Sequence, residues 1–247
     1  MTPPPFDRID AFAARTALIG EDDAVLSYSA LIEKADTIAA PLPGRCLVMV
    51  VCRNDVDCVA GYVGLSRAGA ALLLVHHSLP DNQRAAIEAA FKPAFLYAPG
   101  PDGYALTPTG HDAPELHPDL ALLLTTSGTT GSRNFVRLSY RNLQSNADAI
   151  IEALGIGPED RAITTMPLSY TYGLSILHTH LRAGGSLILT EATLVSPGFW
   201  AALKTHRATG FGGVPFIYDM LLKLRFERMD LPHLKTLTQA GGALGAE

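Results

Sequence analysis

The chain has 247 residues and a formal net charge of −5, with 48% apolar and 17% charged residues. This length is enough to bury a large core in one or two domains, and the composition excludes the low-hydrophobicity, high-charge class of disordered chains. Because there is no excess of basic residues, nucleic acid is not expected as a partner.

From residue 46 onward, short apolar runs alternate with longer amphipathic segments. Residues 47–52, LVMVVC, are apolar without alternation, which is typical of a strand covered by helices on both faces. The alternation predicts an α/β fold of layered sheets with helices on both faces. The expected strands are 47–52, 71–75, 94–98, 120–125, 162–166, 186–190, 209–213 and 235–240, and the expected helices are 56–67, 81–91, 140–154, 173–183, 197–207 and 215–228.

Residues 99–118 are rich in proline, glycine and aspartate, so we expect them to connect a first α/β subdomain, 1–98, to a second, 119–247. Within this connection the triplet YAL could form a short strand. The sequence ends in QAGGALGAE, after a presumed strand and before any helix, so we expect a truncated N-terminal part of a longer protein. A truncated sheet would leave apolar surface uncovered, and self-association of the fragment is therefore possible.

Three cysteines, Cys46, Cys52 and Cys58, are spaced six residues apart. No histidine or cysteine pair completes a zinc-ligand spacing, so we expect buried, reduced thiols, no metal site and a reducing compartment. The N-terminus lacks the charged and apolar regions of a signal peptide, and no apolar run reaches membrane-spanning length. These features predict a cytoplasmic protein without a membrane span.

The segment TTSGTTG, residues 125–131, follows the expected strand 120–125 directly. Gly128 and Gly131 can aim successive backbone N–H groups into one concavity, and the neighbouring hydroxyl groups add further donors. Such a loop at the carboxyl end of a buried strand predicts a cradle for phosphate oxygens. A plain surface turn is the alternative. The Walker pattern does not fit, because no Lys-Ser or Lys-Thr pair follows, and GFGGVP from Gly210 does not complete a dinucleotide fingerprint.

The longer stretch TTSGTTGSRNFVRLSYRNL resembles the signature of the adenylate-forming superfamily, which includes acyl-CoA synthetases, peptide-synthetase adenylation domains and luciferases. Further segments resemble this family in the same order. They are LSYSAL at 26–31, GYVGLSRAGAALLLV at 61–75, MPLSYTYGL at 166–174, GGVPFIYDML at 212–221 and GGALGAE at 241–247.

The resemblance implies an N-terminal part of an AMP-forming ligase, which uses ATP and Mg²⁺ to activate a carboxylic acid and then passes the acyl group to coenzyme A or to a carrier protein. The phosphates would contact Thr126, Ser127, Gly128, Thr129, Thr130, Gly131 and Arg133. Adenine and the acyl group would lie against Gly241, Gly242 and Ala243. The acid pocket would be lined by Tyr170, Tyr172, Gly173, Phe211, Gly213, Val214 and Pro215.

Several positions depart from the family pattern. The usual Pro-Lys pair falls on Arg133 and Asn134, so either Arg133 supplies the cation or the site has lost phosphate affinity. Phe135 replaces a glycine, and Tyr140 and Tyr170 each replace a histidine, which suggests an altered acyl preference. His76 and His77 are expected to be strand-end residues.

The family's magnesium-binding glutamate and catalytic lysine would follow Glu247, so no catalytic set is complete here and the fragment alone is expected to be inactive. Two alternatives stay open. The chain could be a noncatalytic binding or scaffold relative, which the loss of the lysine favours, or an amino-acid adenylation domain. The acid, the thiol acceptor and the oligomeric state are not determined by the sequence.

Overall fold

A computed structural model describes residues 6–112, 114–125 and 135–243. Within these residues the chain forms two six-stranded sheets. Sheet 1 contains, in spatial order, β6 (Gly103–Pro108), β5 (Phe95–Gly100), β3 (Leu47–Cys52), β4 (Ala71–His76), β7 (Leu120–Thr125) and β8 (Phe135–Ser139). Sheet 2 contains β12 (Thr236–Gln239), β11 (Gly210–Gly213), β9 (Arg161–Ile163), β10 (Ser186–Ile188), β1 (Thr16–Ile19) and β2 (Val25–Ser27).

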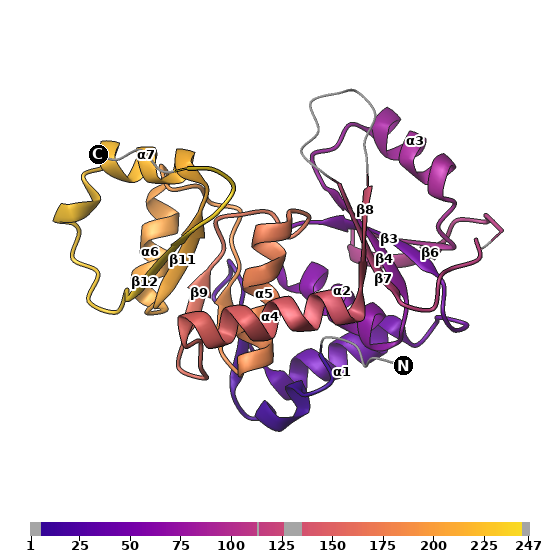
Figure 1. Cartoon of the computed structure of the whole chain (residues 1–247), viewed down its shortest axis with the longest axis horizontal. Coiled ribbons are helices and arrows are strands. Elements are labelled where there is room, and N and C mark those ends of the chain that lie inside the picture. The colour runs from indigo at the N-terminus through magenta and orange to yellow at the C-terminus, as the bar shows by residue number, and fades with distance from the viewer. Residues whose placement is uncertain (1–5, 113, 126–134, 244–247) are drawn as a thin grey trace.

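The helices form layers around and between the sheets (Figure 1). Between the sheets lie α1 (Tyr28–Ala39), α2 (Val56–Arg67), α4 (Tyr140–Leu154) and α5 (Thr171–Ala183), and their buried side chains share one core with both sheets. Helix α3 (Asp81–Phe91) covers the other face of sheet 1, and α6 (Pro197–Thr205) and α7 (Pro215–Lys223) cover the other face of sheet 2. Short 3₁₀ turns lie at Ile9–Phe12 and Phe226–Arg228.

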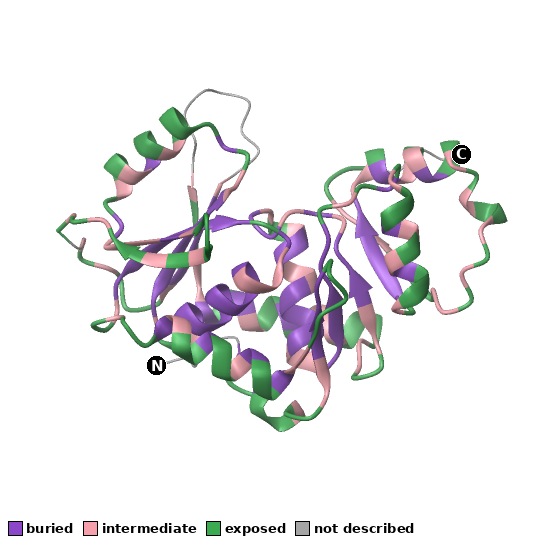
Figure 2. Cartoon of the chain, turned by 180° about the vertical axis from the view of Figure 1, so that it is seen from behind, coloured by how far each residue is buried: buried purple, intermediate pink, exposed green. Residues whose placement is uncertain are grey.

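The strand β3 illustrates why its sequence is apolar without alternation. Val48, Val50 and Cys52 face the helices between the sheets, whereas Leu47, Met49 and Val51 face α3. Figure 2 shows the same division, with buried residues concentrated on the strands and the central helices and exposed residues on the outer helices. The predicted α/β fold with helices on both faces of its sheets is therefore confirmed.

Most predicted elements agree with the structure within one to three residues at each end. Helix α7 is the exception, because the predicted helix 215–228 ends at Lys223. Arg225 takes a left-handed conformation with φ 55°, which a continuing helix does not allow. The strands β1, β2 and β8 and the helix α1 were not predicted, since they are short or lie before residue 46.

The expected division into subdomains 1–98 and 119–247 does not match the sheets. Strand β7 pairs in parallel with β4 of sheet 1, and β1 pairs in parallel with β10 of sheet 2, so each sheet takes strands from both sides of residues 99–118. The expected connection itself contains β6, which pairs antiparallel with β5. Hydrophobic pattern locates strands but carries no information on which distant strand becomes the neighbour.

The cysteines Cys46, Cys52 and Cys58 are buried and free, as predicted. Burial raises the pKa of the Cys46 thiol. Among the described residues, none of the helices is both long and apolar enough to cross a membrane, and no three histidine, cysteine, aspartate or glutamate side chains gather to form a metal site.

Helices α1 and α2 approach each other so closely that Gly64 has no room for a side chain. A Cβ atom on Gly64 would lie 2.0 Å from the carbonyl oxygen of Ala35, which belongs to the backbone of α1 and cannot move aside alone. The second glycine in the segment GYVGLSRAGA, Gly64, is thus explained by helix packing.

We expect Gly64→Ala to destabilise the chain by about 2 kcal/mol, because the helices must separate to admit the methyl group. Gly157→Ala is the control, since the nearest atom to a Cβ there is 4.0 Å away. Urea unfolding of the two variants would measure the difference. Equal midpoints and slopes for the two variants would contradict this account.

A buried histidine joins the helices that pack on the two sheets. His178 of α5 lies 2.8 Å through its Nε2 from the hydroxyl oxygen of Tyr62 in α2, and both side chains are buried. Burial lowers the pKa of His178 from 6.5 to about 3. The folded protein therefore holds a neutral imidazole where the unfolded chain binds a proton.

This depressed pKa predicts a loss of stability on acidification. Above the unfolded pKa both states are neutral, whereas below it only the unfolded state is protonated, and His178 then lowers the unfolding free energy by up to about 1.4 kcal/mol per pH unit. His178→Gln should flatten the stability curve between about pH 6 and pH 4, as measured by urea unfolding at each pH. Parallel curves for the two proteins would show that His178 does not titrate in this way.

Candidate functional site

The carboxyl ends of strands from both sheets meet at one region of the molecule. Asn54 follows β3, Thr190 follows β10, and Met166 lies in the segment between β9 and α5, and these three residues are joined by hydrogen bonds. Ligands of open α/β folds bind at this end of the strands. The predicted phosphate residues Thr126 to Gly131 and Arg133 lie outside the described residues. The flanking residues Thr125 and Phe135 pair with each other in β7 and β8, so the predicted phosphate residues follow the carboxyl end of β7 in the chain.

Asn54 is the central residue of this junction. Its amide nitrogen Nδ2 donates to the carbonyl oxygens of Met166 at 3.3 Å and Thr190 at 3.4 Å, and its Oδ1 accepts from the backbone N–H of Leu168 at 3.2 Å. The side chain is 8% exposed. Asn54, which follows a strand of sheet 1, therefore holds the backbone segment that leads to Tyr170 and into α5, which contains Tyr172.

Carboxylates complete the same junction. Glu191 accepts from the backbone N–H of Asn54 at 2.5 Å and lies 3.0 Å from His77 Nε2. Glu21 accepts from the Thr190 hydroxyl at 2.6 Å, and this bond is the main reason that its pKa is lowered. His76 is the last residue of β4. Its pKa is lowered, mainly because the side chain is partly buried and secondly because of the neighbouring His77. The prediction that His76 and His77 are strand-end residues is thus confirmed.

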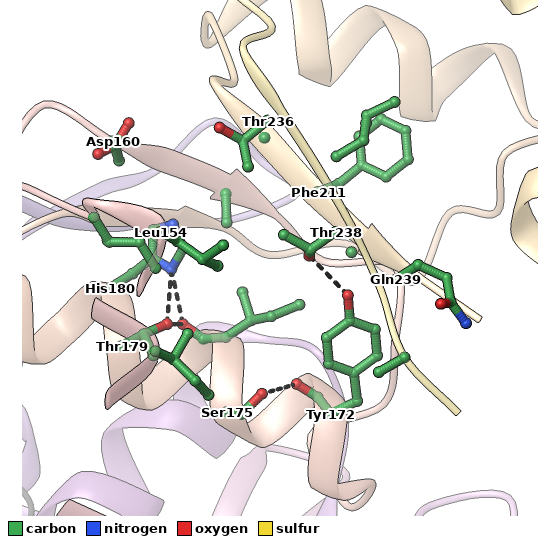
Figure 3. Close-up of a pocket in the computed structure, with 18 of the residues that line it drawn as sticks. Leu154, Asp160, Tyr172, Ser175, Thr179, His180, Phe211, Thr236, Thr238 and Gln239 are labelled. Carbon is green, nitrogen blue, oxygen red and sulfur yellow. Dashed lines mark hydrogen bonds between the residues drawn. The ribbon is translucent and has the colours of Figure 1, made fainter. Parts of the chain in front are cut away.

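A pocket of about 1000 Å³ lies between α4 and α5 on one side and β11 and β12 on the other (Figure 3). Tyr170 and Tyr172 line it at the end nearest the strand carboxyl termini. The hydroxyl of Tyr172 donates to Thr238 Oγ1 across the pocket at 2.7 Å. Burial is the main reason that the pKa of Tyr172 is raised, so this hydroxyl stays protonated at neutral pH.

Not every residue predicted for the acid pocket lines this cavity. Phe211 lines it, but its ring packs edge-on against Phe199 on the α6 side of sheet 2. Gly173 and Gly213 are packing positions, because a Cβ would lie 2.4 Å from the Pro167 carbonyl oxygen or 2.6 Å from Ile217 Cγ2, respectively. The lining does not include Gly173, Gly213, Val214 and Pro215.

The predicted glycine segment lies beside the pocket mouth, where Ala240 belongs to the lining. A Cβ on Gly241 would lie 3.2 Å from the Tyr170 hydroxyl and 3.2 Å from Val214 Cγ1, and one on Gly242 would lie 3.1 Å from Pro215 Cγ. Gly241 also has φ +88°, which favours glycine. Ala243 follows and is exposed. The tertiary structure therefore brings the two predicted groups of residues, 170–215 and 241–243, together.

Sequence analysis missed part of this pocket. Ser175, Ile176, Thr179 and His180 of α5 line it together with Thr238 of β12. The helical spacing of 172, 175–176 and 179 places them on one face, which is a signal present in the sequence. The role of Asn54 has no such signal, because its partners are distant in the chain.

We expect Asn54→Ala to destabilise the protein by about 2–3 kcal/mol, because buried backbone groups lose their partners. Amide exchange at Leu168 should accelerate more than exchange in β3. Asn82→Ala, at an exposed site in α3, is the control. Unchanged exchange at Leu168 would show that Asn54 does not hold this segment.

Comparison with known proteins agrees with this architecture. A family model described as AMP-binding enzyme matches residues 98–247. The chain is 32% identical over 153 residues to sulfoacetate–CoA ligase of Cupriavidus necator, a match that covers 58% of this chain and 30% of that ligase. It is 25% identical over 250 residues to a linear gramicidin synthase of Brevibacillus parabrevis, covering 91% of this chain and 3% of the synthase.

The fold of this chain is also similar to the folds of proteins with solved structures. The ATP-bound crystal structure of MatB from Rhodopseudomonas palustris superposes with a TM-score of 0.79 and 22% identity, over 97% of this chain and 55% of MatB. The chain thus spans about half of MatB and less than a third of the ligase it matches. The family match extends over more than half of the chain, and the chain therefore belongs to the AMP-binding enzyme family, with the fold of the N-terminal domain of adenylate-forming enzymes.

Proposed function

We propose that this chain is the N-terminal portion of an AMP-forming ligase, which activates a carboxylic acid with MgATP to an acyl-adenylate and transfers the acyl group to a thiol. The observation that carries the proposal is the contact of the glycine segment 241–242 with the end of the pocket at Tyr170 and Ala240. The segment TTSGTTG, which follows β7 in the chain, adds the phosphate donors that the proposal requires.

The described residues fit a nucleotide at this edge. Gly241 and Gly242 form a surface that Cβ atoms would fill, and a flat base can approach a backbone of this kind closely. Gly241, Gly242 and Ala243 would hold adenine and the acyl group, while Thr126 to Gly131 and Arg133 would hold the phosphates through backbone N–H groups, hydroxyls and a guanidinium. Bound MgATP supplies an electrophilic phosphorus and a pyrophosphate leaving group.

The residues of this chain would bind and orient the acid. Tyr170 and Tyr172 lie at the pocket end nearest the glycine segment, so a carboxylate there would point to the nucleotide and the rest of the acid would enter the pocket. The ligand for Mg²⁺ is a glutamate that the family resemblance assigns beyond residue 247. For this reason we expect the chain alone not to catalyse the reaction.

Coenzyme A is the preferred thiol acceptor, and a carrier-protein phosphopantetheine is the second. The likeness to a ligase named for coenzyme A supports the first. The likeness to linear gramicidin synthase, which covers 91% of this chain, favours an amino-acid adenylation domain as a second candidate function. Asn134 at the usual lysine position favours a noncatalytic relative.

Two further properties belong to the proposal. The three buried, free cysteines support a reducing compartment such as the cytoplasm. The exposed apolar side chains Phe216 and Leu222 of α7 and Leu237 of β12 support self-association of the chain.

Calorimetric titration with ATP and Mg²⁺ tests the proposal, with the 247-residue chain beside a chain extended to the native C-terminus. We expect the longer chain to bind MgATP and to release pyrophosphate with a suitable acid. Binding by both would assign the phosphate cradle to this chain. Binding by neither would favour the noncatalytic relative.

Arg133→Ala should weaken MgATP binding by the longer chain about tenfold, because a charge-assisted contact to phosphate is lost. Arg137→Ala is the matched control, since Arg137 follows four residues later in β8 and is exposed. If the two variants bind MgATP as tightly as the wild type, Arg133 does not replace the missing lysine.

A further inference from the structure

Three hydroxyl groups of α5 that line the pocket already donate hydrogen bonds within the protein. The Ser175 hydroxyl donates to the carbonyl oxygen of Tyr172 at 2.7 Å, and the Thr179 hydroxyl donates to that of Ile176 at 3.0 Å. The Tyr172 hydroxyl donates to Thr238. Each of these oxygens keeps lone pairs but has no second proton to give. Along α5 the wall therefore offers hydrogen-bond acceptors.

His180 adds a stronger acceptor further along the same helix. Its side chain lines the pocket, and the residue is 9% exposed. Nδ1 lies 2.9 Å from the carbonyl oxygen of Ile176, which can only accept, so Nδ1 carries the proton. Burial lowers the pKa of His180, which makes the ring neutral at neutral pH and leaves a lone pair on Nε2.

Nε2 of His180 has no hydrogen-bond partner among the described residues. Figure 3 shows the ring extending from α5 toward Leu154, with its hydrogen bonds drawn from one nitrogen only. Among the described residues, Arg45 Nε is the only buried polar side-chain atom without a partner, so Nε2 of His180 is accessible from the pocket and is not enclosed by protein atoms. A donor supplied by a ligand in the pocket would satisfy it.

The charges near this end of the pocket do not favour a charged ligand group. Asp160 accepts from the backbone N–H of Gly157 at 2.8 Å and from the Thr209 hydroxyl at 3.3 Å. Lys235 lines the same pocket and carries the opposite charge. The lining of the pocket also includes the apolar residues Ile150, Leu154 and Ile176, and Leu154, toward which the His180 ring extends, is 47% exposed. Burying an ammonium or a second carboxylate here would cost more than burying a neutral hydroxyl.

We propose that the acid taken by this pocket carries a neutral hydroxyl group on its distal part, which donates a hydrogen bond to Nε2 of His180. The inference rests on the proposed function, in which the carboxylate lies near Tyr170 and Ala240. His180 follows Tyr172 by eight residues on α5, which is about 12 Å along the helix axis. The substrate class is therefore a hydroxy acid of medium length.

The test compares matched acids with the full-length protein, by acid-dependent release of pyrophosphate. The pairs are ω-hydroxyoctanoate with octanoate and ω-hydroxydecanoate with decanoate. We expect kcat/KM to be about tenfold higher for the hydroxy acid of at least one pair, because Nε2 of His180 gains a hydrogen-bond donor from the substrate. Equal or higher values for both plain acids would overturn the inference while leaving the ligase activity established. Release with none of the acids, together with a lack of MgATP binding, would instead contradict the proposed function.

Variants of His180 test whether this side chain is responsible for the preference for hydroxy acids. His180→Leu should remove the hydroxyl preference by lowering kcat/KM for the hydroxy acid only, and His180→Gln should restore part of it because an amide oxygen can accept. Ser145→Ala, on the exposed face of α4, is the control and should leave the preference unchanged. A full preference in His180→Leu would overturn the assignment.

Discussion

The side chain of Asn54 is the contact on which the arrangement of the candidate site depends. Three backbone groups from two segments of sheet 2 are satisfied by this one amide, which itself belongs to the turn after a strand of sheet 1. Without it, the carboxyl edges of the two sheets would be joined mainly through the more exposed Glu191 and His77. Because the segment after Leu168 continues into α5, the position of Tyr170 and Tyr172 follows from this contact.

A half-buried arginine has a similar organising role at the other end of sheet 1. Arg45 donates to the carbonyl oxygens of Gly69, His117 and Leu120, and to the hydroxyl of Tyr140. Tyr140 in turn donates to the carbonyl oxygen of Ala70. The tyrosine that replaces a histidine of the family signature is therefore a core residue at the start of α4, and this substitution is explained by packing and not by the acid pocket.

The pocket wall and the junction are built from different parts of the structure. The junction uses backbone groups and a few buried polar side chains, whereas the pocket wall is built from side chains on one face of α5 and from β12. Residues such as Ser175 and His180 can change without disturbing the strand ends, since their own hydrogen bonds stay within α5. The residues of the pocket wall and those of the junction can thus vary independently of each other.

Sequence periodicity by itself determined the α/β class, most strands of both sheets and helices such as α2 and α4, because burial on one or both faces imposes a local hydrophobic period. The sequence motifs identified the family and the glycines beside the pocket mouth. Only the tertiary structure decided that β1 joins sheet 2, that β7 and β8 join sheet 1, and that Gly173 and Gly213 serve packing instead of lining the pocket. It also decided the contacts of Asn54 and the direction of the His180 ring. Hydrogen bonds between residues far apart in the chain and the orientation of a single ring leave no period in the sequence.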